Sequence, residues 1–161
     1  MKRIILILAA LLLSISTFAQ HGKNIYQKYS DAEGVTAVYI SPAMFRLIGS
    51  IPDLEVGEDK VNISPLIQAL NGFYVIDSEN PDINGKLRSE VEALINRGKY
   101  EMLMEVKESG ETVRMYTMGD EKTVAGFLML AAEAAEVTFI CLDGSMPRKD
   151  FEALIAKAVN S

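Results

Sequence analysis

Apolar residues change their spacing along the chain, and the change separates predicted helices from predicted strands. In some segments they recur every three to four residues, which is typical of amphipathic helices. These segments are residues 44–51, 83–95 and 151–159. Elsewhere apolar residues alternate with polar ones or form short unbroken runs, which is typical of strands. The predicted strands are residues 35–40, 73–77, 100–107, 112–118, 124–131 and 137–142.

Local signals mark where several helices begin and end. Three segments begin with a Ser or Asn that can accept a free backbone N–H, followed by a proline that has no N–H to leave unsatisfied. These pairs are Ser41-Pro42, Ser64-Pro65 and Asn80-Pro81. A glycine follows each segment, as expected at a helix C-terminus. These glycines are Gly49, Gly72 and Gly98. A last helix is expected from Pro147, and residues 20–31 form a short helix or an irregular segment.

Residues 40–49 and 63–72 share the pattern I-S-P-x4-L-x-G, at an offset of 23 residues. One interpretation is a duplicated helical unit. The other is that a cap, a proline and a closing glycine are what any short helix requires. We favour the second, because repeat architectures need at least about three copies. The acidic segment between the two, residues 50–62, is predicted to be a solvated loop.

Residues 100–118 predict a β-hairpin whose register follows from its turn. If Ser109 and Gly110 form a two-residue turn, each residue on one strand has one partner on the other. The expected pairs are Met104–Met115, Val106–Val113, Glu105–Arg114 and Leu103–Tyr116. The first two pairs share an apolar face, and the last two share the other face, which contains a charge pair. We expect the methionine and valine face to be buried beneath the helices.

The order of elements is helix, strand, helix, helix, strand, helix, four strands and helix. Consecutive strands favour antiparallel pairing, so we predict an α+β fold. It is expected to be a two-layer sandwich, with helices on one face of a mainly antiparallel sheet. The other face would then be open to a protein partner or to a second copy of the chain. The candidate interaction face comprises Leu103, Glu105, Arg114, Tyr116 and Met118.

Residues 1–19 have the three parts of a secretory signal peptide. Lys2 and Arg3 are followed by an apolar run at 4–13 and by small residues before Gln20. The run is shorter than the ~20 apolar residues that span a bilayer. We therefore expect cleavage before Gln20, export to the periplasm or cell envelope, and no stable membrane anchor afterwards. The remaining residues, 20–161, are expected to form one domain.

Charge and cysteine content narrow the range of partners. The full chain has a formal net charge of −6, which becomes −8 when Lys2 and Arg3 leave with the signal. No basic cluster in the sequence offsets this charge, so binding to nucleic acid or to anionic lipid is not expected. Cys141 is the one cysteine of the chain, which excludes an intramolecular disulfide. It lies in an apolar run, where we expect it to be buried and unreactive.

Catalytic and metal-binding patterns are weak in this sequence. His21 is the one histidine, and it lies too close to the expected new N-terminus to act as the fixed base of a catalytic triad. Residues 80–85 match the start of a Ca²⁺ loop, but Val91 stands where the bidentate glutamate belongs. Three methionines within 102–115 would suit Cu(I), although core packing explains them better. We expect no catalytic residue, metal or cofactor.

The carboxyl-terminal half resembles a known family. The similar segments are residues 100–104 (Tyr-Glu-Met-Leu-Met), the turn 109–111 (Ser-Gly-Glu), the strand 113–116, and residues 143–146 (Asp-Gly-Ser-Met) after the last apolar strand. They resemble domain of unknown function 4252, a family of small exported bacterial proteins. The resemblance extends over most of residues 23–160 and implies an export-associated α+β domain. It implies no assigned reaction and supplies no catalytic residues.

The sequence thus predicts an exported, non-enzymatic protein that acts by binding another protein or by self-association. The alternatives are a hydrolase or a protein that binds a small ligand or a metal. A deep pocket with converging carboxylates would favour a hydrolase, whereas a flat sheet face would favour an interaction protein.

Overall fold

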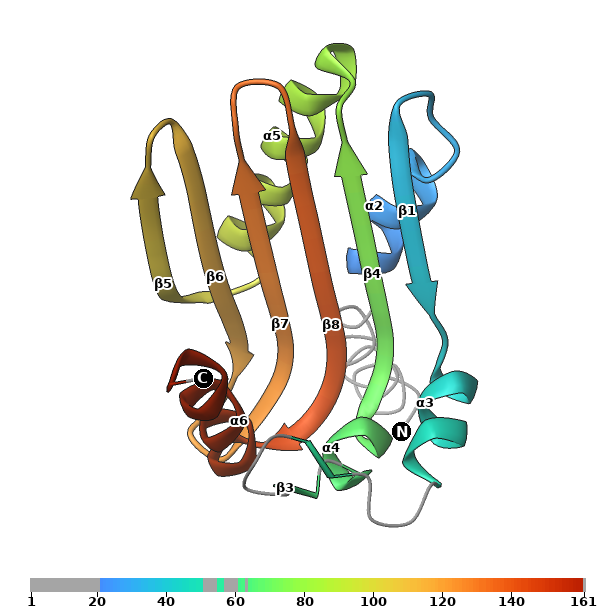
Figure 1. The fold of residues 1–161 in the computed structure, drawn as a ribbon, viewed down its shortest axis with the longest axis vertical. Coiled ribbons are helices and arrows are strands. Elements are labelled where there is room, and N and C mark those ends of the chain that lie inside the picture. The colour runs from blue at the N-terminus through green and yellow to red at the C-terminus, as the bar shows by residue number, and fades with distance from the viewer. Residues whose placement is uncertain (1–20, 51–54, 57–60, 63, 161) are drawn as a thin grey trace, which may run out of the picture.

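Six strands form one antiparallel sheet at the centre of the protein (Figure 1). The computed structural model describes residues 21–50, 55–56, 61–62 and 64–160. The strand order is β1-β4-β8-β7-β6-β5, with β1 and β5 at the two edges. The strands are β1 (Val35–Ile40), β4 (Leu70–Ser78), β5 (Glu101–Glu108), β6 (Glu111–Gly119), β7 (Thr123–Ala132) and β8 (Val137–Pro147). The expected α+β fold with an antiparallel sheet is confirmed.

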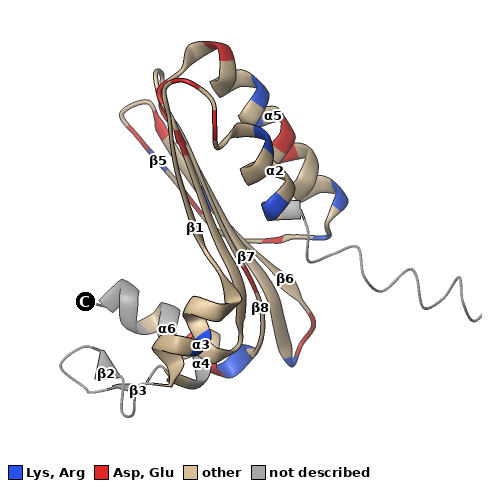
Figure 2. Cartoon of the chain, turned by 90° about the vertical axis from the view of Figure 1, so that its right-hand side faces the viewer, with Lys and Arg blue, Asp and Glu red and all other residues tan. Residues whose placement is uncertain are grey.

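Two helices, α2 (His21–Tyr29) and α5 (Pro81–Arg97), cover one face of the sheet (Figure 2). The helical stripe predicted at 83–95 packs against the strands, and Leu87 and Val91 in its middle are fully buried. Burial of each such side chain contributes roughly 1.5–3 kcal/mol relative to exposure. Their neighbours in the main core include Ile76, Leu128, Leu130, Phe139 and Cys141.

Three further helices lie on the other face, at one end of the sheet only (Figure 2). They are α3 (Pro42–Gly49), α4 (Ser64–Gln68) and α6 (Arg148–Asn160). Phe45 of α3 and Phe151 of α6 belong to a second, smaller apolar cluster with Leu70, Val124 and Met146. The sequence pattern predicts all three helices, but the expectation that the helices share one face of the sheet is wrong, because these three pack on the opposite face around the second cluster. The pattern does not predict the short hairpin of β2 (Glu55–Val56) and β3 (Val61–Asn62).

Two of the helix starts marked in the sequence are confirmed as capped. The Ser41 hydroxyl oxygen accepts from the backbone N–H of Met44 at 3.3 Å, and Asn80 Oδ1 accepts from that of Asp82 at 2.9 Å. Each side chain satisfies an N–H that the first helical turn leaves free. The expected helix end at Gly72 is wrong, because α4 ends earlier and Gly72 lies within β4.

The two segments with the shared I-S-P pattern form unequal units. α3 has eight residues, whereas α4 has five. Gln68 of α4 donates from Nε2 to the carbonyl oxygen of Gly49 at 2.6 Å, which joins the two helices. A Cβ at Gly49 would lie 2.5 Å from Gln68 Cγ. The close packing of α4 against this position explains why it is a glycine, so no duplication is needed to account for it. Ile63, the first residue of the second copy of the pattern, lies outside the described residues.

The register expected for the β5–β6 hairpin is confirmed except at one pair. The structure pairs Met104 with Met115, Glu105 with Arg114, and Val106 with Val113. Ser109 and Gly110 both have positive φ, 49° and 96°, as a type I′ turn requires. The pair of Leu103 with Tyr116 is wrong, because a register shift places Met102 opposite Tyr116. Such a shift inserts one residue into an edge strand and is typical of a β-bulge.

The expected assignment of the two hairpin faces is wrong. Tyr116 is 7% exposed and belongs to the main core, whereas Met104 and Val106 are 38% and 42% exposed. β5 is an edge strand, and all eight of its residues are exposed. The register fixes which residues share a face, but the position of the helices decides which face is buried.

Candidate interaction surface

A row of apolar side chains crosses the open face of the sheet, which we define as the face opposite α2 and α5. Each member is the direct cross-strand partner of the next. From edge to edge, this apolar row consists of Met104, Met115, Met129, Ile140, Val75 and Val38. Strands spaced about 4.8 Å apart make a six-strand row about 24 Å long. It is therefore long enough to contact an extended segment of a partner.

The apolar row is partly open to solvent. Its end members are the most exposed, with Val38 at 42%, and its inner members are half-buried. The neighbouring row toward the end of the sheet includes Phe73, Phe127 and Leu142, which pack on the second apolar cluster. No described helix covers the middle and upper part of this face (Figure 2). An exposed apolar strip of this kind is typical of a binding surface.

Acidic residues lie on the same face at the end of the sheet where β7 turns into β8. Thr138 donates from Oγ1 to Asp77 Oδ1 at 2.7 Å. The neighbouring Asp77 raises the pKa of Glu136 above its ordinary value, and Glu133 and Glu79 add to the effect. A carboxyl group with a raised pKa lies where negative charges repel one another more than cations neutralise them. This end of the open face is therefore electrostatically suited to a cationic partner.

The β5 edge combines apolar and charged positions. Its outer side pairs with no described strand. Met102, Leu103, Met104 and Val106 are all exposed, and charged residues stand at positions 101, 105, 107 and 108. Charges and bulges are the usual protection of an edge strand against indiscriminate pairing. The edge is thus open to pairing, but its charges restrict which strand can pair with it.

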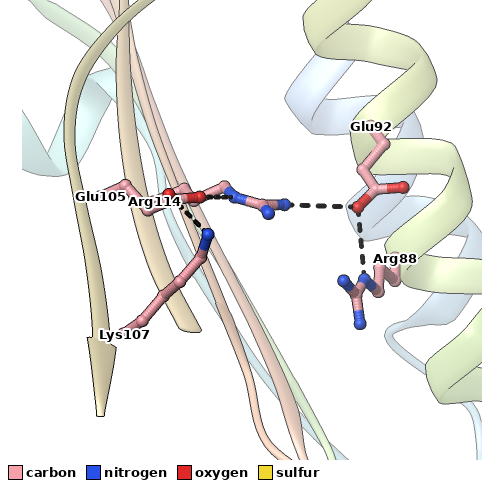
Figure 3. Close-up of polar contacts among 5 residues, drawn as sticks. All are labelled: Arg88, Glu92, Glu105, Lys107 and Arg114. Atoms are coloured by element: carbon pink, nitrogen blue, oxygen red, sulfur yellow. Dashed lines mark hydrogen bonds and ion pairs between the residues drawn. The ribbon is translucent and has the colours of Figure 1, made fainter. Parts of the chain in front are cut away.

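Arg114 joins the β5–β6 hairpin to α5 (Figure 3). Its Nε donates to Glu105 Oε2 at 2.7 Å, and its Nη1 lies 3.6 Å from Glu92 Oε1 on α5. Lys107 lies 2.9 Å from Glu105, and Arg88 lies 3.2 Å from Glu92. The hydrogen bond from Arg114 lowers the pKa of Glu105 below its ordinary value, and Lys107 adds to this effect. The network is ionic and lies on the helix side of the hairpin.

The interaction face expected from the sequence is therefore split between the helix layer and the sheet edge. Tyr116 is in the core, Arg114 bonds to a residue of α5, and Met118 is half-buried. Leu103 and Glu105 are exposed on β5. The exposed Met104 and Val106 lie on the opposite face, as partners of Met115 and Val113. The alternation along β6 identifies both faces, but it does not say on which of them α5 packs.

The sequence model of one protein family matches residues 29–154. The family is described as Domain of unknown function (DUF4252). The chain belongs to this family. The resemblance found in the sequence is confirmed, and the matched residues of the DUF4252 domain include all six strands of the sheet. No curated protein matches the chain.

The DUF4252 domain also contains a buried polar cluster on its helix-covered face. Asp143 on β8 is 7% exposed, its Oδ1 accepts from the Cys141 thiol at 3.6 Å, and its Oδ2 has no hydrogen-bond partner among the described residues. Burial raises the pKa of Asp143 to about 6 and that of Tyr74 to about 12. A Cβ at Gly22 of α2 would lie 2.5 Å from Cys141 Sγ, so the helix closes tightly over the cluster.

The expected burial of Cys141 is confirmed. Burial raises the pKa of its thiol well above the ordinary value, and the charge of Asp143 adds to the shift. The thiol is therefore protonated at neutral pH and is a poor nucleophile. Asp143 lies just beyond the last strand predicted from the sequence, which ends at residue 142. In the structure β8 continues to Pro147, so Asp143 takes the next inward position after Cys141.

The described part of the DUF4252 domain shows a shallow groove and no metal cluster. The groove, of about 330 Å³, is lined by Asn24, Ile25, Lys28, Glu90, Leu94 and Arg97. Lys28 and Glu90 form an ion pair there. No three His, Cys, Asp or Glu side chains converge in the described residues. In the calcium-like segment, Asn80 caps α5, and Asn84 donates from Nδ2 to the Ala135 carbonyl oxygen at 2.9 Å. No helix in the described part is long and apolar enough to cross a membrane.

Proposed function

We propose that this DUF4252 protein is an exported, non-enzymatic binding protein that holds a protein partner on the open face of its sheet. The observation that carries the proposal is the apolar row, which is exposed on a face with no described helix above its middle. A flat apolar strip suits a protein partner, whereas substrates and small ligands are usually enclosed in concave pockets. In this proposal the partner binds one face of the sheet, and α2 and α5 pack on the opposite face.

A hydrolase is the less favoured alternative. Hydrolysis by a pair of carboxylates, as in most glycosidases, requires both groups to lie beside a substrate cleft. Among the described residues, Asp143 is the one buried carboxylate, so no second buried carboxylate completes such a pair. The groove between α2 and α5 is occupied by the ion pair of Lys28 and Glu90. These features favour a binding protein over an enzyme and over a protein with an enclosed small-ligand site.

The open face indicates the chemistry of the partner. The apolar row requires an apolar strip on the surface of the partner. The acidic end of the open face favours positive charge on the partner. Opposite charges at the rim of an interface accelerate encounter and select partners more than they add affinity. We therefore propose a protein partner with an exposed apolar segment flanked by Lys or Arg. The repulsion that raises the pKa of Glu136 would be relieved by those cations.

We propose that the partner is met after export, in the periplasm or the cell envelope. The support is the three-part signal at residues 1–19, which lies outside the described residues. Mass spectrometry of protein from the periplasmic fraction of the native cell should find a mature chain that begins at Gln20. An intact Met1 in washed membranes would contradict export with cleavage.

Photo-crosslinking in the native cell tests the open face. A photoreactive residue in place of Met129, in the middle of the apolar row, should give discrete adducts with an envelope protein. The same residue in place of Ser89, which is exposed on α5, should give none. Glu136→Lys should weaken the adducts at position 129, because it reverses the charge beside the proposed cationic partner. Equal adducts at both positions, or none at position 129, would refute the proposed function.

A further inference from the structure

The two sides of β5 carry different kinds of residue. Met104 and Val106 lie on the open face, as cross-strand partners of Met115 and Val113. Glu105 and Lys107 lie on the helix side, where their side chains form an ion pair of 2.9 Å (Figure 3). Read along the strand, residues 104–107 therefore alternate apolar positions with charges of changing sign. Such a pattern can complement a second copy of itself.

We propose that β5 pairs antiparallel with β5 of a second copy, about a two-fold axis through Val106. In this register Val106 faces Val106 of the second copy, and Glu105 faces Lys107 of the second copy. The symmetry produces the charge pair twice. Cross-strand pairs of opposite charge and of β-branched residues both stabilise antiparallel strands. Met104 then lies diagonal to Val106 of the second copy, within reach of a long side chain.

The two neighbouring registers are less favourable. An axis through Glu105 would place this residue opposite itself, and like charges directly opposite each other are destabilising. An axis through Lys107 would likewise place two lysines opposite each other, with the same penalty. The charges on β5 disfavour pairing with unrelated strands. The same charges also select one register for pairing with β5 of a second copy.

Pairing at β5 joins two six-stranded sheets into one of twelve strands. Both open faces then lie on the same side, and the Val106 pair lies between the two apolar rows, each of which ends at the Met104 of its own copy. This inference rests on the proposed function, because the dimer would extend the proposed binding face. The second copy binds at the edge of the sheet, and the protein partner binds on its open face. One strand pair is a small interface, so we expect a dissociation constant of roughly 10–100 µM.

Sedimentation velocity on the mature chain, residues 20–161, tests the dimer. Concentrations from about 5 µM to about 500 µM bracket the expected dissociation constant and should show a monomer becoming a dimer. Val106→Glu should raise that constant by at least about tenfold, because it places two carboxylates at the axis. Val38→Glu is the matched control, since Val38 is also 42% exposed on the open face but lies on the opposite edge strand. It should leave the dimer intact.

A mixture of Val106→Glu and Val106→Lys chains tests the register itself. Each variant alone should stay monomeric, and the equimolar mixture should dimerise, because an axis at this position puts the two substituted side chains opposite each other. Circular dichroism of each variant establishes that it is folded. An unmodified chain that stays monomeric throughout, a mixture that does not associate, or a dimer lost in Val38→Glu alone would overturn the inference.

The two proposals fail separately. Adducts at position 129 from a chain that sediments as a monomer would keep the proposed function and remove the dimer. A dimer without adducts at position 129 would keep the dimer and remove the proposed function.

Discussion

Glu105 on β5 and Arg114 on β6 lie directly opposite each other, and Arg114 also reaches Glu92 on α5 (Figure 3). One guanidinium therefore connects an edge hairpin with the helix layer. The sequence predicts the cross-strand pair, but not the contact with α5. That contact marks the helix-covered side of the hairpin and leaves the methionine and valine side exposed.

Removal of Arg114 should loosen the hairpin edge with little effect on the rest of the fold. Arg114→Met removes both ionic contacts and keeps an unbranched side chain of similar length. Since its carboxylate partners are partly exposed, amide hydrogen exchange in β5 should accelerate by no more than about fivefold. Arg88→Met is the control, because it removes a cation that contacts only Glu92 of this network, and β5 exchange should not change.

The contribution of the Glu105–Arg114 pair should disappear in acid. Arg114 lowers the pKa of Glu105, so the folded state favours the carboxylate more than the unfolded state does. This contribution is present above the ordinary glutamate pKa of about 4.3 and is lost as the pH falls through the lower folded value. The difference in β5 exchange between wild type and Arg114→Met should therefore shrink progressively as the pH falls below about 4. A difference that does not shrink would mean that the pair is not its source.

Tyr116 and Met104 should differ sharply in their contribution to stability. Tyr116→Ala leaves a cavity in the main core and should lower the free energy of unfolding by about 3 kcal/mol or more. Met104→Ala removes a side chain that is 38% exposed on an edge strand, and should cost about 1 kcal/mol or less. Urea denaturation of the two variants measures the difference. A larger loss in Met104→Ala would mean that the helices cover the other face.

Asp143 should make the protein less stable as the pH rises toward neutrality. Its folded pKa is raised to about 6 by burial, from an ordinary value of 3.8, so the folded state holds the proton more tightly than the unfolded state. Its contribution is full below the ordinary value and is lost as the pH rises through 6, by about 3 kcal/mol at pH 7. Denaturation at pH 4 and pH 7 should show this loss in the wild type.

Asp143→Asn should remove that pH dependence and be more stable than the wild type at pH 7. Asp82→Asn is a suitable control, because Asp82 is an exposed residue in the first turn of α5. Its pH profile should keep the loss between pH 4 and pH 7. Equal stability of the wild type at the two pH values would show that the Asp143 carboxyl is not buried in solution.

Two glycines with positive φ should respond differently to alanine. A Cβ at Gly119 would clash with the backbone carbonyl oxygen of Thr123, in the turn between β6 and β7. Gly119→Ala should therefore cost more than about 2 kcal/mol. Gly110 has open space around its Cβ position, so Gly110→Ala should cost only the backbone strain of its φ of 96°, about 1–2 kcal/mol. Thermal denaturation of both variants checks the order.

Features that depend on short stretches of chain were predictable. The strand at 35–40 has the expected bounds, and Ser41 and Asn80 cap their helices as expected. The turn at Ser109 and Gly110 sets the hairpin register through its own geometry. Errors arose where neighbours distant in sequence intervene, as at Gly72, which lies in β4 opposite Asp143 of β8.

The candidate surface required contacts that no single segment encodes. The row that includes Met104, Met129 and Val75 exists because β1 pairs with β4 and β4 pairs with β8. Along the chain, α3 and α4 lie between β1 and β4, and α5 and three strands lie between β4 and β8. Likewise, Asp143 is buried on a central strand that pairs with β4 and β7, where its partners are Gly72 and Gly126.

The sequence by itself determined the class of each main element, the pairing of β5 with β6 and the family. Periodicity, capping and turn geometry act within a few residues, so they can be derived from a single chain. Only the tertiary structure decided that α5 packs on the Tyr116 side, and therefore that Met104 and Val106 face solvent. Both faces of the hairpin carry apolar residues, so the choice depends on long-range packing of the helix layer against all six strands.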